Sequence, residues 1–290
     1  MSTPTLQSGS RGRGPDAGAP VVEVDELTVY NHYAEVPAVS SLSFELRPGE
    51  VLGIVGESGS GKTITCRALL GALPELFEIT GGSVRLFGRD IRTLSKRDWV
   101  RLRGSGIAAV FQDPASYLNP SITVGKQVEE VLRVKTGLSK REARTRSVEL
   151  LQAMHIRDPE YVHHQFPHEL SGGMLQRALI AAAVASEPAI LIADEATTAL
   201  DVTVQAEIID LLDDLREQLG LALIVVSHDL AVVAQLCSKI LVMRSGEVVE
   251  QGTRDEVLFS PQHEYTRLLL DEHHRYGLDR FLAAREATDD

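Results

Sequence analysis

The segment from Val51 to Thr63 constrains the fold more than any other part of the chain. Val51–Val55 is a short apolar run typical of a buried strand, and the Gly-rich loop behind it fits the spacing G-x-x-x-x-G-K-[ST] without a gap. Glycines let successive backbone N–H groups turn toward phosphate oxygens, and a helix expected over Thr63–Leu73 adds partial positive charge at its start. The expected phosphate-binding residues are Gly56, Glu57, Ser58, Gly59, Ser60, Gly61, Lys62 and Thr63.

A second apolar run ends in two acids. Ala189–Ala193 is expected to form a buried strand, and Asp194 and Glu195 follow it directly. A buried carboxylate without a partner is costly, so two acids at the end of a core strand indicate a use for them. With the phosphate loop, they predict that Asp194 and Thr63 hold Mg²⁺ near the phosphates. Glu195 is then expected to polarise an attacking water.

The alternation of strands and helices predicts the fold class. Continuous apolar strands, among them Leu223–Val226, alternate with helices, which is typical of an α/β fold whose mainly parallel sheet is covered on both faces. Further strands are expected between Val22 and Leu46. From about Pro114 to Glu169, helical spacing and charge replace the strand pattern, which predicts a helical insertion. The predicted helices are Val124–Val134, Lys140–Met154, Met174–Ser186 and Val204–Leu219.

Composition divides the chain into parts. Residues 1–20 are rich in Gly, Pro, Ser and Arg and predict a disordered tail. The ordered domain is expected over residues 21–270, with its helical subdomain at about 114–186. Residues 271–290 are left as a short C-terminal extension.

Charge, cysteine and hydropathy limit the possible functions. The 29 basic and 41 acidic residues give a net charge of −12, which argues against a nucleic-acid partner. Cys66 and Cys237 are too few for a disulfide framework or a cysteine-rich metal cluster. The apolar runs are far shorter than the roughly 20 residues that span a bilayer, and the N-terminus lacks the apolar core of a secretory signal. Any role at a membrane is therefore expected to come through partners.

The stretch Leu170–Arg177, LSGGMLQR, lies between the phosphate loop and the two acids. In that order the three elements resemble the nucleotide-binding subunits of ATP-binding cassette (ABC) transporters, and the resemblance runs from about Val22 to Leu270. It implies a P-loop NTPase core with an antiparallel β subdomain and an inserted helical subdomain. It also implies that two chains close over ATP, each touching the γ-phosphate held by the other. The residues that match this motif are Ser171, Gly172, Gly173 and Gln176.

The resemblance assigns roles to four more residues. Gln112 matches the glutamine that touches Mg²⁺ and the attacking water, and His228 matches the histidine that grips the γ-phosphate. Asp201 matches an aspartate that crosses the interface between the two subunits. The family stacks adenine on an aromatic ring upstream of the phosphate loop, and Tyr33 is preferred over Tyr30 for that position.

Three segments are similar to the oligopeptide, dipeptide and nickel importer branch of the family. One runs through residues 112–127, one is Pro167–Leu170, and one is Pro261–Thr266, where Glu264 stands in place of the usual proline. Many members of the branch end in a cysteine-rich segment that can hold an iron–sulfur cluster. No cysteine follows Cys237 here, so no such cluster is expected.

The resemblance implies an ATPase that uses ATP and Mg²⁺ at the cytoplasmic face of the cell membrane. It would drive import of peptides, nickel or a related small solute through two transmembrane permease subunits. A second ATPase subunit, the same chain or a homologous one, would face it, and an extracytoplasmic substrate-binding protein would be an indirect partner. The substrate is left open because selectivity belongs to that protein and to the permeases.

Other functions remain as alternatives. The cassette could serve an exporter, or belong to a non-transport ATPase acting on DNA or the ribosome, although the long coiled-coil insertion of the DNA-repair forms is not visible. An accessory cassette subunit of phosphonate breakdown is also similar. His163, His164 and His168 lack a carboxylate or cysteine at ligand spacing and are expected to be solvated rather than metal-bound. Cys66 is expected to pack inside a helix interface.

Overall fold

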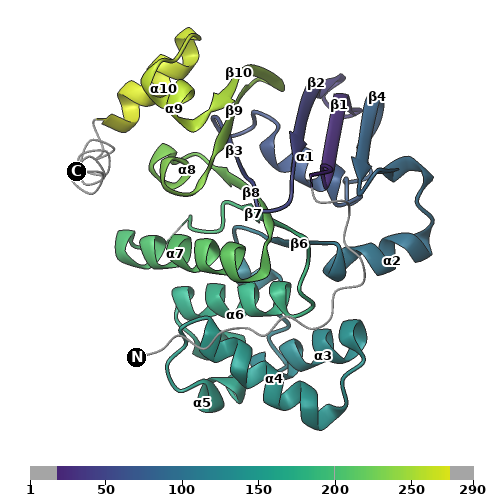
Figure 1. The fold of residues 1–290 in the computed structure, drawn as a ribbon, viewed down its shortest axis with the longest axis vertical. Helices are drawn as coiled ribbons and strands as arrows, with labels where there is room; N and C mark the ends of the chain where they lie inside the picture. The colour runs from purple at the N-terminus through teal and green to yellow at the C-terminus, as the bar shows by residue number, and fades with distance from the viewer. Residues whose placement is uncertain (1–17, 199, 275–290) are drawn as a thin grey trace. The chain divides into compact units, whose positions relative to one another are not determined.

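The computed structural model describes residues 18–198 and 200–274 (Figure 1). Most of the expected tail, Ala199 and most of the expected C-terminal extension lie outside these residues. The described chain forms two compact units. One is Ser95–Leu223, and the other joins Pro20–Leu94 to the residues from Ile224 onward, so the boundary falls inside strand β8. Each unit is described by itself.

The second unit holds an antiparallel sheet with the strand order β2-β1-β4-β5. Side chains alternate along β1, where Val22, Val24 and Val29 are buried, and Val24 pairs with Phe44 on one side and Val84 on the other. The strands are β1 (Val22–Asn31), β2 (Val36–Leu46), β4 (Phe77–Leu86) and β5 (Arg89–Asp90). The predicted strands between Val22 and Leu46 are thus confirmed, whereas β4 was not predicted.

The same unit holds strands that carry the phosphate loop. Fully buried β3 (Val51–Val55) lies between β8 (Ala222–Ser227) and β9 (Lys239–Arg244), and it runs parallel to β9. β10 (Glu247–Thr253) pairs antiparallel to β9. The helical elements of this unit are α1 (Lys62–Leu69), η1 (Ile91–Thr93), α8 (Leu230–Leu236), α9 (Arg254–Phe259) and α10 (Glu264–His274).

In the first unit, β6 (Ile107–Val110) and β7 (Ile190–Asp194) pair in parallel, with Val110 opposite Ala193. The chain contains parallel pairs, such as β6–β7 and β3–β9, as well as an antiparallel sheet of β1, β2, β4 and β5, which confirms the predicted α/β class. Helix α2 (Lys96–Ser105) precedes β6, and α7 (Val202–Leu219) follows β7.

The regular secondary structure of the described chain from Pro114 to Val184 is entirely helical, with turns between the helices. Helix α6 lies between α7 and the group α3–α5 (Figure 1). A capping box, in which Ser139 and Glu142 bond each other's backbone N–H, starts α4. The elements are η2 (Pro114–Ser116), α3 (Val124–Thr136), α4 (Lys140–Ala153), α5 (Pro159–His163), η3 (Pro167–Glu169) and α6 (Gly172–Val184).

Several predicted helix bounds were wrong by a few residues. The helix predicted over Thr63–Leu73 begins at Lys62 and ends at Leu69, because the chain turns at Gly71, whose φ is +58°. The helix predicted from Met174 begins at Gly172, since Ser171 caps it. In the described residues no helix combines the length and apolarity that crossing a bilayer requires.

Candidate functional site

The phosphate loop connects β3 to α1 in the second unit. Gly61, the residue before α1, has a φ of +102°, and a Cβ on it would lie 2.6 Å from the carbonyl oxygen of Ala38. Only glycine fits there. The N-cap residue Gly61 has no side chain that could cap the first turn of α1, and no acidic residue lies in that turn. Its N–H groups and dipole are therefore suited to an anion.

Neighbouring elements of the same unit hold the loop from outside. The N–H of Gly246, in the turn between β9 and β10, donates to the carbonyl oxygen of Ser60 at 3.1 Å. The hydroxyl of Tyr265, on α10, accepts from the N–H of Glu57 at 3.0 Å. These contacts fix both halves of the loop.

Lys62 is buried inside the loop. Its Nζ donates to the carbonyl oxygens of Gly56 and Glu57, each at 2.8 Å. The Ser60 hydroxyl oxygen is also buried and has no hydrogen-bond partner among the described residues. A positive charge and an unsatisfied hydroxyl inside a curled backbone fit the oxygens of a phosphate group.

The two acids lie at the end of strand β7 in the first unit. Asp194, the last residue of β7, is only 4% exposed. Glu195 is half-buried and has a φ of +50°, a backbone conformation that costs free energy for a residue with a side chain. Its Oε2 accepts from the Thr198 hydroxyl at 3.3 Å. The end of β7 therefore carries a buried carboxylate, that of Asp194, and the next residue, Glu195, carries a second carboxylate on a strained backbone.

The start of α6 carries the Ser-Gly-Gly segment. The Ser171 hydroxyl accepts from the N–H of Met174 at 3.4 Å and so caps the helix. Gly173 packs against α7, where an added Cβ would lie 2.7 Å from Val204 Cγ1. Gln176 is 1% exposed, and its Nε2 has no hydrogen-bond partner in the described chain.

A buried arginine fixes α6 to its neighbours within this unit. The guanidinium of Arg177 donates to the Glu207 carboxylate on α7 at 2.6 Å and to the carbonyl oxygen of Met154, behind α4, at 2.8 Å. Arg177 therefore ties the helical group to α7. Sequence reasoning did not assign it a role, although a charged residue on the apolar face of a helix is the signal that could have identified it.

The other predicted residues lie near element ends. In the first unit, Gln112 follows β6 and is exposed, and the Asp201 carboxylate caps α7 by accepting from the N–H of Val204 at 3.0 Å. In the second unit, His228 follows β8 and is exposed, and Tyr33 is 83% exposed, so its ring is free to stack.

The predicted residues thus form two groups. Tyr33, the phosphate loop and His228 lie in the second unit. The first unit contains Gln112, Ser171, Gly172, Gly173, Gln176, Asp194, Glu195 and Asp201.

The histidines predicted to be solvated include one that is not. His163 is 1% exposed, and its Nε2 lies 2.9 Å from the carboxylate of Glu129 on α3. Burial lowers the pKa of His163 more than the Glu129 carboxylate raises it, which favours a neutral imidazole. The prediction that His163 is solvated was wrong, because its partner Glu129 lies on another helix, far from it in sequence. His164 and His168 are exposed, as predicted.

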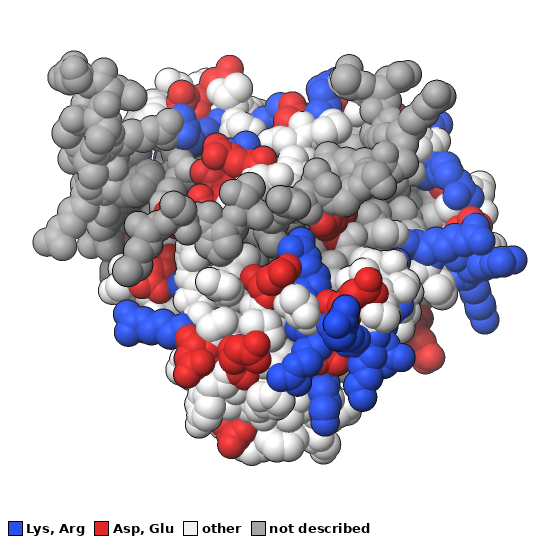
Figure 2. All heavy atoms as spheres, turned by 60° about the horizontal axis from the view of Figure 1, so that its bottom comes forward, with Lys and Arg blue, Asp and Glu red and all other residues white. Residues whose placement is uncertain are grey.

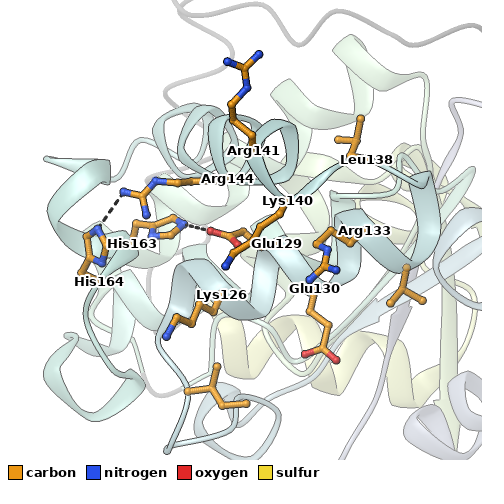
Figure 3. A pocket seen from close by; sticks show the side chains of 12 residues that line it. Lys126, Glu129, Glu130, Arg133, Leu138, Lys140, Arg141, Arg144, His163 and His164 are labelled. Atoms are coloured by element: carbon orange, nitrogen blue, oxygen red, sulfur yellow. Dashed lines mark hydrogen bonds and ion pairs between the residues drawn. The ribbon is translucent and has the colours of Figure 1, made fainter.

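A cavity of about 1020 Å³ opens beside this pair, between α3, α4 and α5 (Figure 3). Arg144 lies within hydrogen-bond distance of His164, at 3.1 Å, and Lys126 and Arg133 line the rim. Figure 2 shows basic and acidic side chains together on this end of the molecule. In residues 18–198 and 200–274, no group of three or more His, Cys, Asp or Glu could hold a metal ion.

Comparison with known proteins gives consistent matches. A family model described as "ABC transporter" matches residues 39–198. The dipeptide transport ATP-binding protein DppD of Lactococcus lactis subsp. cremoris is 45% identical over 254 residues, which are 87% of this chain and 73% of that protein. The oligopeptide transport ATP-binding protein OppD of Bacillus subtilis is 45% identical over 253 residues, 86% of this chain and 71% of that protein.

Solved structures match at the level of the fold. The ATP-binding cassette MJ0796, in a dimeric post-hydrolysis state bound to ADP and Pi, superposes with a TM-score of 0.72 and 30% identity over 80% of this chain and 98% of that one. CbiO1 of Clostridium perfringens, part of the ABC transporter complex CbiONQ, gives a TM-score of 0.73 and 29% identity over 89% of this chain and 97% of that one.

Proposed function

Because the chain belongs to the ABC transporter family, and is an ATPase of that family, we propose that it powers uptake of peptides or a related small solute. Two relatives, each matched over more than two thirds of its own length, are named for dipeptide and oligopeptide transport. The observation that carries the role of ATP in this proposal is the phosphate loop, whose backbone, buried lysine and glycine before the helix fit an anion.

In this proposal the loop from Gly56 to Thr63 binds the phosphates of ATP. Lys62 moves from the carbonyl oxygens of its own loop to the phosphate oxygens, a charge-assisted contact. The exposed ring of Tyr33 stacks on adenine, and His228 donates to the γ-phosphate. These residues bind and orient ATP.

Mg²⁺ would be held by Thr63, Asp194 and Gln112. Their hydroxyl, carboxylate and amide oxygens are the hard donors that Mg²⁺ prefers. When bound, the ion neutralises negative charge on the phosphate oxygens. Glu195 accepts a hydrogen bond from the attacking water and polarises it. The strained backbone of Glu195 supports this role, since strain collects where function requires a fixed geometry.

The working unit is a pair of ATPase subunits. Ser171, Gly172, Gly173, Gln176 and Asp201 face the nucleotide or the loop of the second subunit, which is the same chain or a homologous one. Gly172 suits this because, among the described residues, an added Cβ there comes near Leu200 alone, at 3.6 Å. The pair docks at the cytoplasmic face of the membrane on two permease subunits, which receive the solute from an extracytoplasmic binding protein.

The substitution Glu195→Gln tests the catalytic assignment. The amide keeps the shape of the side chain but cannot act as a base, so we expect turnover to fall by about 10²–10⁴ while ATP binding is retained. Glu187→Gln is a matched control in the same unit, because Glu187 is also half-buried and has a φ of +49°. Near-normal turnover of the Glu195→Gln subunit, with Glu187→Gln also near normal, would remove Glu195 from this role.

Uptake tests the transport assignment. Cells that lack the gene are expected to take up labelled di- and oligopeptides only when the wild-type chain is restored. Restoration by the Glu195→Gln chain would separate uptake from ATP hydrolysis. Export of the peptide, or copurification with ribosomes in place of membrane proteins, would contradict the proposal.

A further inference from the structure

The C-terminal segment reaches back to the phosphate loop within the second unit. Tyr265, in the first turn of α10, is 8% exposed. Its hydroxyl accepts a hydrogen bond from the N–H of Glu57 at 3.0 Å, although the two residues are 208 positions apart. Because leaving a partly buried N–H without an acceptor costs free energy, this hydrogen bond restrains the backbone of the phosphate loop at Glu57.

Tyr265 is held through its ring and through its backbone. The guanidinium carbon of Arg244, at the end of β9, lies 4.8 Å from the ring centroid, within the range of a cation–π contact. The N–H of Tyr265 donates to His263 Nδ1 at 3.1 Å. These two contacts therefore hold Tyr265 in the position where its hydroxyl accepts from the N–H of Glu57.

Glu250, on β10, fixes the chain just before Tyr265. One oxygen of its carboxylate accepts from the N–H of Gln262 at 2.7 Å, and the other accepts from the N–H of His263 at 3.0 Å. Burial raises the pKa of Glu250, but the hydrogen bonds from the backbone N–H groups of Gln262 and His263 oppose this effect, and the pKa lies below its usual value. The carboxylate thus stays charged and bonded at neutral pH.

Glu57 is held at both ends of its backbone. Its N–H meets Tyr265, and its carbonyl oxygen accepts from Lys62 Nζ at 2.8 Å. If Lys62 turns to phosphate, that carbonyl contact is lost, while the contact to Tyr265 is on the other side of the residue and can remain. The tyrosine is thus placed to keep the loop in shape when its lysine moves.

We infer that Tyr265 is a positioning residue for ATP binding, which it preorganises by fixing Glu57 of the phosphate loop. The inference rests on the proposed role of that loop in binding ATP. It also gives a role to the segment Pro261–Thr266, which lies far from the loop in sequence. Anything that displaces the start of α10 is expected to weaken ATP binding.

The substitution Tyr265→Phe tests the inference because it keeps the ring over Arg244 and removes only the acceptor. We expect the KM for ATP to rise about three- to tenfold, the equivalent of one hydrogen bond, with kcat changed less than twofold. In a Glu195→Gln background, the Kd for ATP should rise by the same factor. Glu250→Gln should raise KM in the same direction by a smaller factor. Tyr161→Phe, at an exposed tyrosine of α5, is the control and should leave KM unchanged.

The outcomes separate the two proposals. An unchanged KM in Tyr265→Phe, while Glu195→Gln abolishes turnover, overturns the positioning role alone. A loss of kcat and of thermal stability with no rise in KM also overturns it, because that is the result of a merely structural tyrosine. Normal turnover by Glu195→Gln contradicts the catalytic proposal, whatever Tyr265→Phe does.

Discussion

Two neighbouring glycines at the start of α6 are expected to respond differently to the same substitution. A Cβ added at Gly173 would lie 2.7 Å from Val204 Cγ1, well inside the roughly 3.5–4.0 Å at which carbon atoms pack. For a Cβ added at Gly172, the nearest atom in the part of the chain that the structure describes is Leu200 Cδ2 at 3.6 Å, an ordinary contact. Gly173 is thus required by the packing of α6 on α7, whereas Gly172 has room for a methyl group.

The magnitudes follow from two opposing effects. Alanine is favoured over glycine inside a helix by about 1 kcal/mol. Overpacking costs about 1–3 kcal/mol, and Val204 is β-branched and sits on a helix, so it cannot easily rotate away. Gly173→Ala should therefore lower the free energy of unfolding by about 0–2 kcal/mol, and Gly172→Ala should raise it by up to about 1 kcal/mol.

Urea and thermal unfolding of the two variants measure the difference. A gap of about 1–3 kcal/mol corresponds to about 2–4 °C in the thermal midpoint for each kcal/mol in a domain of this size. Val204→Ala should rescue Gly173→Ala, because it removes the methyl group that the new Cβ meets. Gly172→Ala should instead reduce ATP turnover without loss of stability, since its methyl group would face the second subunit. Equal midpoints for the two variants, or no rescue, would refute the packing argument.

Two further predictions concern the first unit. Arg177→Met removes the donor shared by Glu207 and the Met154 carbonyl, so urea unfolding should show a loss of about 1–3 kcal/mol, and Glu207→Gln should cost less; equal losses would contradict the assigned contacts. Burial holds the pKa of His163 below its unfolded value near 6.5, so the unfolded chain binds a proton that the folded chain resists, and stability should fall as the pH drops below about 6.5. Urea midpoints at about pH 7.5 and 5.5 should differ less in His163→Gln than in the wild type, and parallel pH curves would count against this account.

The sequence predicts those elements whose side chains repeat a simple pattern. Val51–Val55 and Ile190–Asp194 are buried on both faces, so they read as continuous apolar runs and were found to within a residue. The phosphate loop was found because its backbone requires glycine at fixed positions, and the spacing of those glycines is visible in the sequence. β4 was missed because it contains two adjacent glycines and because exposed polar residues, Glu78, Thr80 and Arg85, interrupt its apolar pattern.

Contacts between distant residues were not predictable from spacing. Glu129 and His163 form a buried pair across two helices, and each residue alone reads as part of a solvated face. Tyr265 was noticed only as part of a segment, because its bond to Glu57 depends on how α10 returns to the loop. Such pairs depend on tertiary packing, which overrides the local preference of a charged or aromatic residue.

Because Lys62 is hydrogen-bonded to its own loop, a substitution that removes its ammonium group would have more than one effect. Its ammonium group donates hydrogen bonds to the carbonyl oxygens of Gly56 and Glu57. A truncated side chain would leave those oxygens short of a donor in partly dry surroundings, and the backbone around them would rearrange to recover one. An inactive Lys62 variant would therefore combine two effects, a rearranged phosphate loop and the loss of the ammonium charge. Its activity would not measure how strongly the ammonium group alone binds a triphosphate.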